Sequence, residues 1–154
     1  CLHCAKKMGD DKKLGGKIVY LHSIIIHMTT IFLIDDDPDD REIFAELLAE
    51  DHPSIVLQQA INGADAFEKL KSENFTKPDL IFLDLNMPIM DGRTFLQHIK
   101  MDPDLKDIPV IIYTTSSSDL DRNFAMENKA AFFLTKQYSL QQQRKDIMAA
   151  IKNF

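Results

Sequence analysis

Short apolar runs alternate with amphipathic segments along most of this chain. The runs, which end in polar or turn-forming residues, predict strands over residues 31–34, 55–60, 80–83, 110–113 and 131–134. The segments that follow them repeat apolar side chains at intervals of three and four residues, which predicts helices over residues 39–50, 64–72, 93–101, 119–128 and 140–152. Five strands are therefore expected to alternate with five helices.

Strict alternation with short connections requires parallel strands joined by right-handed crossovers. We therefore expect an α/β fold with a doubly wound, five-stranded parallel sheet in the flavodoxin-like order 2-1-3-4-5 and five helices on its two faces. In such sheets the functional crevice lies beyond the carboxyl ends of the strands. The residues that follow each strand are therefore the first candidates for chemistry.

Polar residues suited to phosphate chemistry gather at these strand ends. Asp35 and Asp36 follow the first strand, Asp84 ends the third, Thr114 follows the fourth and Lys136 follows the fifth. Because the first and third strands are neighbours in this order, three carboxylates would share one pocket and would need cationic partners. Lys136 and a hard cation would supply them, with Mg²⁺ suiting the ligands best and Mn²⁺ able to substitute. The central Asp84 is the predicted nucleophile, forming an aspartyl phosphate.

These motifs resemble the response-regulator receiver domains of two-component signalling, in particular the small single-domain type. The resemblance covers about residues 29–154 and rests on Asp35-Asp36 after the first strand together with the run Leu83-Asp84-Leu85-Asn86-Met87-Pro88-Ile89-Met90-Asp91-Gly92. The Met-Pro and Asp-Gly pairs in this run predict a turn that shapes the loop over the site.

The resemblance implies a role for each strand-end residue. Asp84 would be the phosphoacceptor, and Thr114 and Lys136 would contact the phosphoryl group. Phe133 would be the switch aromatic, moving inward as Thr114 shifts toward the phosphate. The resemblance also implies four metal ligands. Asp36 would bind the ion directly and Asp35 largely through water. Asp84 would bind as the phosphoacceptor, and Asn86 through its backbone carbonyl.

Two positions depart from the family's pattern. Gln137 follows the lysine where the family usually has a proline after a cis peptide bond. A cis bond before a non-proline residue costs about 2.5–4 kcal/mol, so a trans bond is favoured and the reach of Lys136 is left open. Thr115 stands beside Thr114 where small residues predominate, which would narrow access to the phosphate.

Residues 1–28 lie outside the alternation and are expected to be a leader, disordered or non-native, before a receiver domain at 29–154. An alternative is a zinc site, since tetrahedral zinc could be bound by Cys1, Cys4, His22 and His27, although the loop between the pairs is longer than in zinc fingers. Residues 9–17 do not fit a phosphate-binding loop, because the glycine spacing is off by one and Ile18 replaces the required hydroxyl residue.

The composition of the chain limits which kinds of molecule it can bind. A net charge of −6 and a pI near 5.3 argue against nucleic-acid binding, and no apolar stretch is long enough for a membrane span. We expect a cytoplasmic protein that catalyses only its own phosphorylation and dephosphorylation. Its predicted partners are a histidine kinase or histidine phosphotransfer protein and an unknown downstream protein. Because the chain stops after the fifth helix, output is expected through protein contacts, and a phosphorylation-dependent homodimer through the last two helices is left open.

Two alternatives accompany this prediction. A haloacid-dehalogenase-like phosphatase would use Asp35 as nucleophile and Asp37 as acid, but position 39 is Asp where Thr or Val is expected, and no acidic pair follows a strand after Lys136. A degenerate receiver would act only as a binding module, and the presence of all five strand-end residues counts against it.

Overall fold

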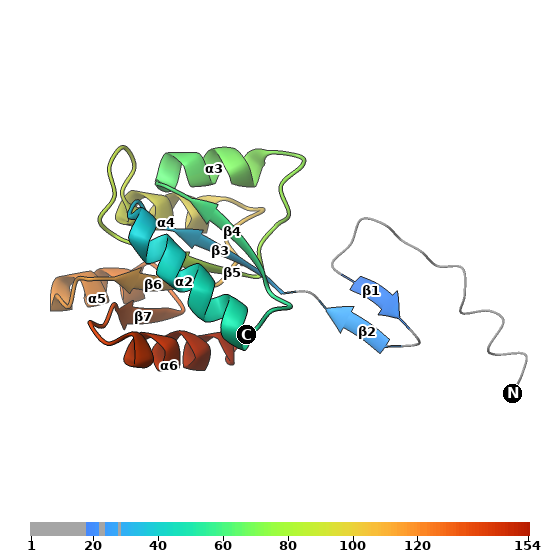
Figure 1. Cartoon of the computed structure of the whole chain (residues 1–154). Coiled ribbons are helices and arrows are strands. Elements are labelled where there is room, and N and C mark those ends of the chain that lie inside the picture. The colour runs from blue at the N-terminus through green and yellow to red at the C-terminus, as the bar shows by residue number, and fades with distance from the viewer. Residues whose placement is uncertain (1–17, 22–23, 28) are drawn as a thin grey trace, which may run out of the picture.

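The computed structural model describes residues 18–21, 24–27 and 29–154. Within 29–154 it contains one five-stranded parallel sheet, shown in Figure 1. Its strands are β3 (Thr30–Ile34), β4 (Val56–Ala60), β5 (Leu80–Leu83), β6 (Val110–Thr114) and β7 (Phe132–Thr135). Their order is β4-β3-β5-β6-β7. This confirms the predicted order 2-1-3-4-5.

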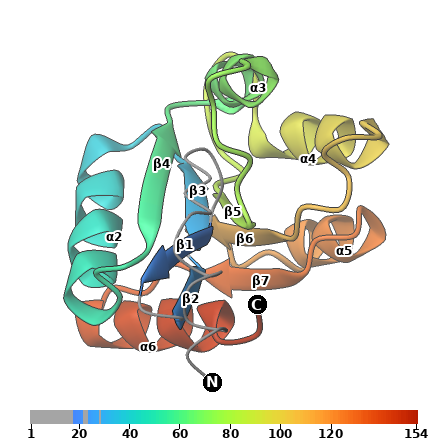
Figure 2. The same ribbon diagram turned by 90° about the vertical axis from the view of Figure 1, so that its right-hand side faces the viewer.

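A helix follows each strand of this sheet. The helices are α2 (Pro38–Asp51), α3 (Gly63–Lys71), α4 (Gly92–Met101), α5 (Asp119–Glu127) and α6 (Leu140–Ile151). Figures 1 and 2 show α2 and α6 on one face of the sheet and α3, α4 and α5 on the other. The predicted helix boundaries differ from the observed ones by one residue or less at each end, because each helix begins after a polar cap that the sequence makes recognisable.

Each face of the sheet has its own apolar core. On one face, Phe44 of α2 packs edge-on against Phe82 of β5, with 4.9 Å between the ring centroids. On the other, Phe95 of α4 and Phe32 of β3 are fully buried in the same apolar cluster. All residues of β3 and β5 are buried, as expected for central parallel strands that are covered on both faces. Burial of both faces leaves the strand ends as the place where polar side chains can gather.

The structure also describes two short strands before the parallel sheet. β1 (Ile18–Leu21) pairs antiparallel with β2 (Ile24–His27). The predicted strands did not include this pair, in which two runs rich in β-branched residues flank a two-residue connection. Three residues of the alternative zinc site, Cys1, Cys4 and His22, lie outside the described residues, as does the stretch 9–17. The leader assignment stays a prediction.

Among the described residues, no helix is long and apolar enough to cross a membrane.

Candidate functional site

The acidic pocket forms where β3 and β5 end side by side. Ile34 and Leu83 are partners in the register of these strands, so the residues that follow them, Asp35 and Asp84, lie next to each other. Asp36 adds a third carboxylate, and one oxygen from each of the three lies within 4.8 Å of the others. Asp35 and Asp84 are buried while Asp36 is exposed. Such a cluster offers hard oxygen ligands to a divalent cation at the edge of the sheet.

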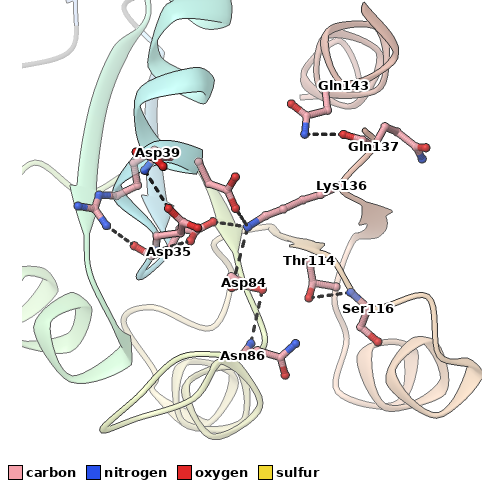
Figure 3. A network of polar contacts seen from close by, with 12 residues as sticks. Asp35, Asp39, Asp84, Asn86, Thr114, Ser116, Lys136, Gln137 and Gln143 are labelled. Atoms are coloured by element: carbon pink, nitrogen blue, oxygen red, sulfur yellow. Dashed lines mark hydrogen bonds and ion pairs between the residues drawn. The ribbon is translucent and has the colours of Figure 1, made fainter. Parts of the chain in front are cut away.

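Lys136 brings the compensating charge into this pocket from the end of β7. Its ammonium nitrogen lies 2.6 Å from Asp35 Oδ2, 2.6 Å from Asp40 Oδ2 and 4.0 Å from Asp84 Oδ2 (Figure 3). It also lies 5.4 Å from the centroid of the Tyr113 ring. Only 5% of the lysine side chain is exposed. The cationic partner that three neighbouring carboxylates require is therefore provided by the chain itself.

Burial and charge together shift the pKa values of these groups. Burial raises the pKa of Asp35 to about 6, although the positive charge of Lys136 acts in the opposite direction. Burial also raises the pKa of Asp84, again opposed by Lys136 and by a hydrogen bond from the Thr114 hydroxyl. Burial alone would lower the pKa of Lys136, but the nearby carboxylates of Asp35 and Asp84 raise it above its usual value. The neighbouring carboxylates thus favour the charged form of this lysine.

Thr114 ends β6 on the other side of Asp84 and is fully buried. Its side-chain oxygen accepts a hydrogen bond from the backbone N–H of Ser116 at 3.3 Å. The Ser116 hydroxyl in turn donates to Asp121 of α5 at 2.6 Å, and Arg93 of α4 donates to the same carboxylate at 2.6 Å and 3.1 Å. The loop that carries Thr114 is therefore tied to the starts of two helices.

The loop after β5 contacts Asp84 at the edge of the pocket. The backbone N–H of Asn86 points at Asp84 Oδ1 from 3.4 Å, and the Asn86 side chain is exposed. Asp91 caps α4, and the N–H of Gly92 donates to Leu85 O at 3.0 Å. A Cβ atom on Gly92 would lie 2.0 Å from the Asp84 carbonyl oxygen. The Asp-Gly pair thus lets α4 begin directly against the backbone of the candidate nucleophile.

A glutamine on α6 supports the chain after Lys136. Gln143 Nε2 donates to the carbonyl of Gln137 at 2.9 Å, and the Gln143 residue is 8% exposed. The Lys136–Gln137 bond is trans, as are all peptide bonds among the described residues. The backbone N–H of Lys136 donates to Thr114 O at 2.7 Å. The lysine reaches the carboxylates in this arrangement, which answers the question that the missing proline left open.

Two of these polar contacts were not predicted from the sequence. Neither Asp40 nor Gln143 follows directly after a strand in the sequence, where the site residues were expected. Asp40 has one signal in the sequence, its spacing from Asp36. It follows Asp36 by about one helical turn, at the start of a helix whose first residues lie beside the pocket. Gln143 has no such signal, because a polar residue on a terminal helix is normally exposed.

Phe133, the predicted switch aromatic, lies on β7 and is half-buried against the core that α3, α4 and α5 share with the sheet. The guanidinium carbon of Arg122 on α5 lies 4.7 Å from the centroid of its ring. An inward movement of this ring stays a prediction.

The phosphatase alternative finds little support in the geometry. Asp37, its proposed acid, caps α2 by accepting a hydrogen bond from the N–H of Asp39 at 2.9 Å. Asp35, its proposed nucleophile, is 1% exposed and paired with Lys136. Neither carboxylate is presented as an acid–nucleophile pair would require.

Comparison with known sequences agrees with the geometry. The family model described as the response regulator receiver domain matches residues 31–151. The response regulator Rcp1 of Synechocystis sp. is 39% identical over 115 residues, covering 71% of this chain and 78% of Rcp1. Protein PilH of Pseudomonas aeruginosa is 32% identical over 109 residues, covering 71% of this chain and 86% of PilH. A match of 34% identity also spans 13% of the sensor histidine kinase CheAY of Helicobacter pylori, so related segments occur within longer proteins.

Solved structures give the same result. The phosphorylated cyanobacterial phytochrome response regulator RcpA superposes with a TM-score of 0.75 at 32% identity, covering 80% of this chain and 91% of RcpA. The Mn²⁺-bound form of Rcp1 superposes with a TM-score of 0.73 at 34% identity, covering 79% of this chain and 90% of that structure. With its fold, its strand-end residues and these relatives in agreement, the chain belongs to the response regulator receiver domain family.

Proposed function

We propose that Asp84 accepts a phosphoryl group from a histidine kinase or histidine phosphotransfer protein in a reaction that depends on a divalent cation. The observation that carries this proposal is the position of Asp84, a buried carboxylate between an acidic cluster and a buried ammonium group 4.0 Å away. A phosphoryl group there would meet positive charge on one side and the Thr114 hydroxyl on the other. Asp84 is therefore favoured over Asp35, whose near oxygen is already held by the lysine.

The residues present fit a divalent metal ion. Carboxylate oxygens of Asp35, Asp36 and Asp84 lie close enough to share one ion, and the backbone carbonyl of Asn86 is the further ligand that the family resemblance suggests. Oxygen-only ligands favour Mg²⁺, with Mn²⁺ as a substitute, and Rcp1 has been solved with Mn²⁺ bound. When bound, the ion would withdraw charge from the phosphoryl oxygens.

The transfer itself requires little from the protein beyond positioning. A carboxylate oxygen of Asp84 attacks the phosphorus atom, a P–O bond forms, and the P–N bond of the donor phosphohistidine breaks, leaving the donor imidazole to take up a proton. Lys136 and Thr114 donate hydrogen bonds to the transferred oxygens. Hydrolysis of the acyl phosphate by water later restores Asp84, so the protein turns over its own phosphorylation and no metabolite.

For output we propose contacts through α5 and β7. Exposed apolar side chains gather on these elements and on the segment after them: Leu120, Met126, Phe132, Tyr138 and Leu140. Phe133 lies on β7 itself, and the segment after Thr114 is joined to α5 by the hydrogen bond from Ser116 to Asp121, so a shift of Thr114 on phosphorylation would alter this surface. A downstream protein or a second phosphorylated copy would be the partner, and the net charge of −6 supports a protein over a nucleic acid.

The deciding experiment is intact-protein mass spectrometry after incubation with acetyl phosphate and Mg²⁺. The native chain is expected to gain one phosphate, and Asp84→Asn none. Asp91→Asn is the matched control, because it removes a carboxylate from the same loop while asparagine can still cap α4. It should gain the phosphate as the native chain does.

Two outcomes would contradict the proposal. A phosphate adduct on Asp84→Asn would place the acceptor elsewhere, with Asp35 of the phosphatase alternative as the next candidate. If neither the native chain nor Asp91→Asn gains a phosphate, the protein is a degenerate receiver that acts as a binding module.

A further inference from the structure

The Lys136 ammonium has one more close partner than its proposed role requires. Of its three hydrogen-bond donors, one meets Asp35 Oδ2 at 2.6 Å and another meets Asp40 Oδ2 at 2.6 Å. Asp84 Oδ2 lies at 4.0 Å, beyond hydrogen-bond distance. The lysine is thus drawn toward the start of α2 and away from the candidate acceptor.

Asp40 reaches the lysine from a helix, whereas the other pocket residues come from strand ends. It is the third residue of α2, and its side chain is 29% exposed against 5% for Lys136. It therefore approaches the ammonium from the side nearer to solvent. Asp39, one position earlier, carries the same charge in the same first turn but is exposed.

A carboxylate in the first turn of a helix is favourable whether or not it meets a lysine, because it interacts with the positive end of the helix dipole. This would explain Asp39 and Asp40 equally. It does not explain why Asp40, and not Asp39, lies at hydrogen-bond distance from a buried ammonium that is 96 positions away in the sequence. The contact therefore indicates a role beyond helix stabilisation.

We propose that Asp40 is a positioning residue that holds Lys136 on the α2 side of the pocket and competes for its ammonium with the phosphoryl group on Asp84. This inference rests on the proposed function of Asp84. For Lys136 to donate to a phosphoryl oxygen, its side chain must leave or share the Asp40 carboxylate. Asp40 therefore weakens the hold of the site on its phosphoryl group and shortens the lifetime of the phosphorylated state.

The first test is whether Asp40 restrains the lysine. In metal-free protein, the NMR signal of the Lys136 ε-methylene group, assigned by its loss in Lys136→Met, is expected to shift in Asp40→Asn and to stay in place in Asp39→Asn. Equal shifts in both variants, or none in either, would show that the contact does not hold the lysine.

The second test measures competition with beryllofluoride, a mimic of the phosphoryl group, at saturating Mg²⁺ by calorimetry. Asp40→Asn is expected to bind it more tightly than the native chain, by roughly two- to fivefold, the range that a partly exposed ion pair can contribute. Its phosphorylated form should decay more slowly by a similar factor. Asp39→Asn, which loses the same charge, should behave like the native chain.

The outcomes separate this inference from the proposed function. If the native chain and Asp40→Asn both bind the mimic with the same affinity, or if Asp40→Asn binds it more weakly, the competition is refuted while Asp84 remains the acceptor. If the native chain binds no mimic and takes no phosphate, the proposed function fails, and the inference that rests on it fails with it.

Discussion

The ammonium of Lys136 lies 2.6 Å from the Asp35 carboxylate, and 5% and 1% of the two side chains are exposed. An ion pair buried this deeply cannot be replaced by water when one member is lost. Its two residues are 101 positions apart in the sequence, so the pair also joins the first and last strands of the receiver fold along the chain. Both the stability of the domain and the charge of its pocket depend on it.

Removal of the lysine should therefore destabilise the protein. Lys136→Met is expected to lower the free energy of unfolding by roughly 2–4 kcal/mol in metal-free buffer at neutral pH, because it leaves buried carboxylates without a counter-charge, a cost that proton uptake by Asp35 partly offsets. Urea denaturation measures this. Lys69→Met is the control, because the Lys69–Asp65 pair is 40% and 26% exposed and is worth at most about 1 kcal/mol. Equal losses in the two variants would show that burial of the Lys136 pair contributes nothing.

Metal binding should depend on pH through Asp35. Burial raises the pKa of Asp35 to about 6, so in the metal-free protein this carboxyl takes up a proton as the pH falls below that value. A metal ion requires the ionised carboxylate, and the proton therefore competes with it. Mg²⁺ affinity is expected to be nearly constant above about pH 7 and to fall by about tenfold per pH unit below about pH 5. Calorimetric titrations with Mg²⁺ across this pH range test this expectation. Asp35→Asn should bind Mg²⁺ more weakly, and its affinity should depend less on pH.

The two adjacent threonines should differ in function. Thr114 is fully buried beside Asp84, while Thr115 is exposed. Thr114→Ala removes a hydroxyl donor to the developing phosphoryl charge and is expected to slow phosphate uptake from acetyl phosphate by roughly tenfold or more. Thr115→Ala should take up phosphate at the native rate or faster, because any narrowing of the pocket entrance is relieved. A slowing of the same size in Thr115→Ala would contradict this assignment.

Gly92 should tolerate no side chain. A Cβ atom there would lie 2.0 Å from the Asp84 carbonyl oxygen and 2.8 Å from Leu85 Cα, both backbone atoms. Gly92→Ala is expected to cost about 2–4 kcal/mol of stability and to displace the phosphoacceptor. Gly63→Ala offers a comparison, because the two nearest atoms there belong to the flexible side chain of Met90 and the nearest backbone atom, the Met90 carbonyl oxygen, is 3.0 Å away. It should cost clearly less. Thermal unfolding and phosphate uptake are measured for both variants. Gly92→Ala should lose more stability and more phosphate uptake than Gly63→Ala.

Ile89 lies in the loop over the pocket with a φ of 68° and is 88% exposed. A β-branched residue is strained in this left-handed region, and exposure means that its side chain adds little packing. Ile89→Gly should therefore stabilise the protein by about 1 kcal/mol in chemical denaturation. A loss of stability would show instead that the exposed isoleucine makes favourable contacts.

The pattern of residues alone was enough to predict the helices and strands, the order of the sheet and the gathering of five residues at one edge: Asp35, Asp36, Asp84, Thr114 and Lys136. This was possible because buried parallel strands appear as short apolar runs, and because right-handed crossovers leave few arrangements for five alternating strands and helices. The carboxyl ends of parallel strands then lie at the same edge whatever the details of packing. The strand pair β1 and β2 was missed because it belongs to no such alternation.

The contacts among the pocket residues could not be predicted from the sequence. Lys136 lies closer to Asp35 and Asp40, at 2.6 Å each, than to Asp84, at 4.0 Å, so its preference depends on small differences in side-chain position. These follow from how α2 is rotated against the sheet and from the path of the chain after β7, where Gln143 holds the Gln137 carbonyl. Helix rotation is set by the packing of Phe44 and Leu48 into the core, and such long-range packing is not encoded in any local pattern of residues.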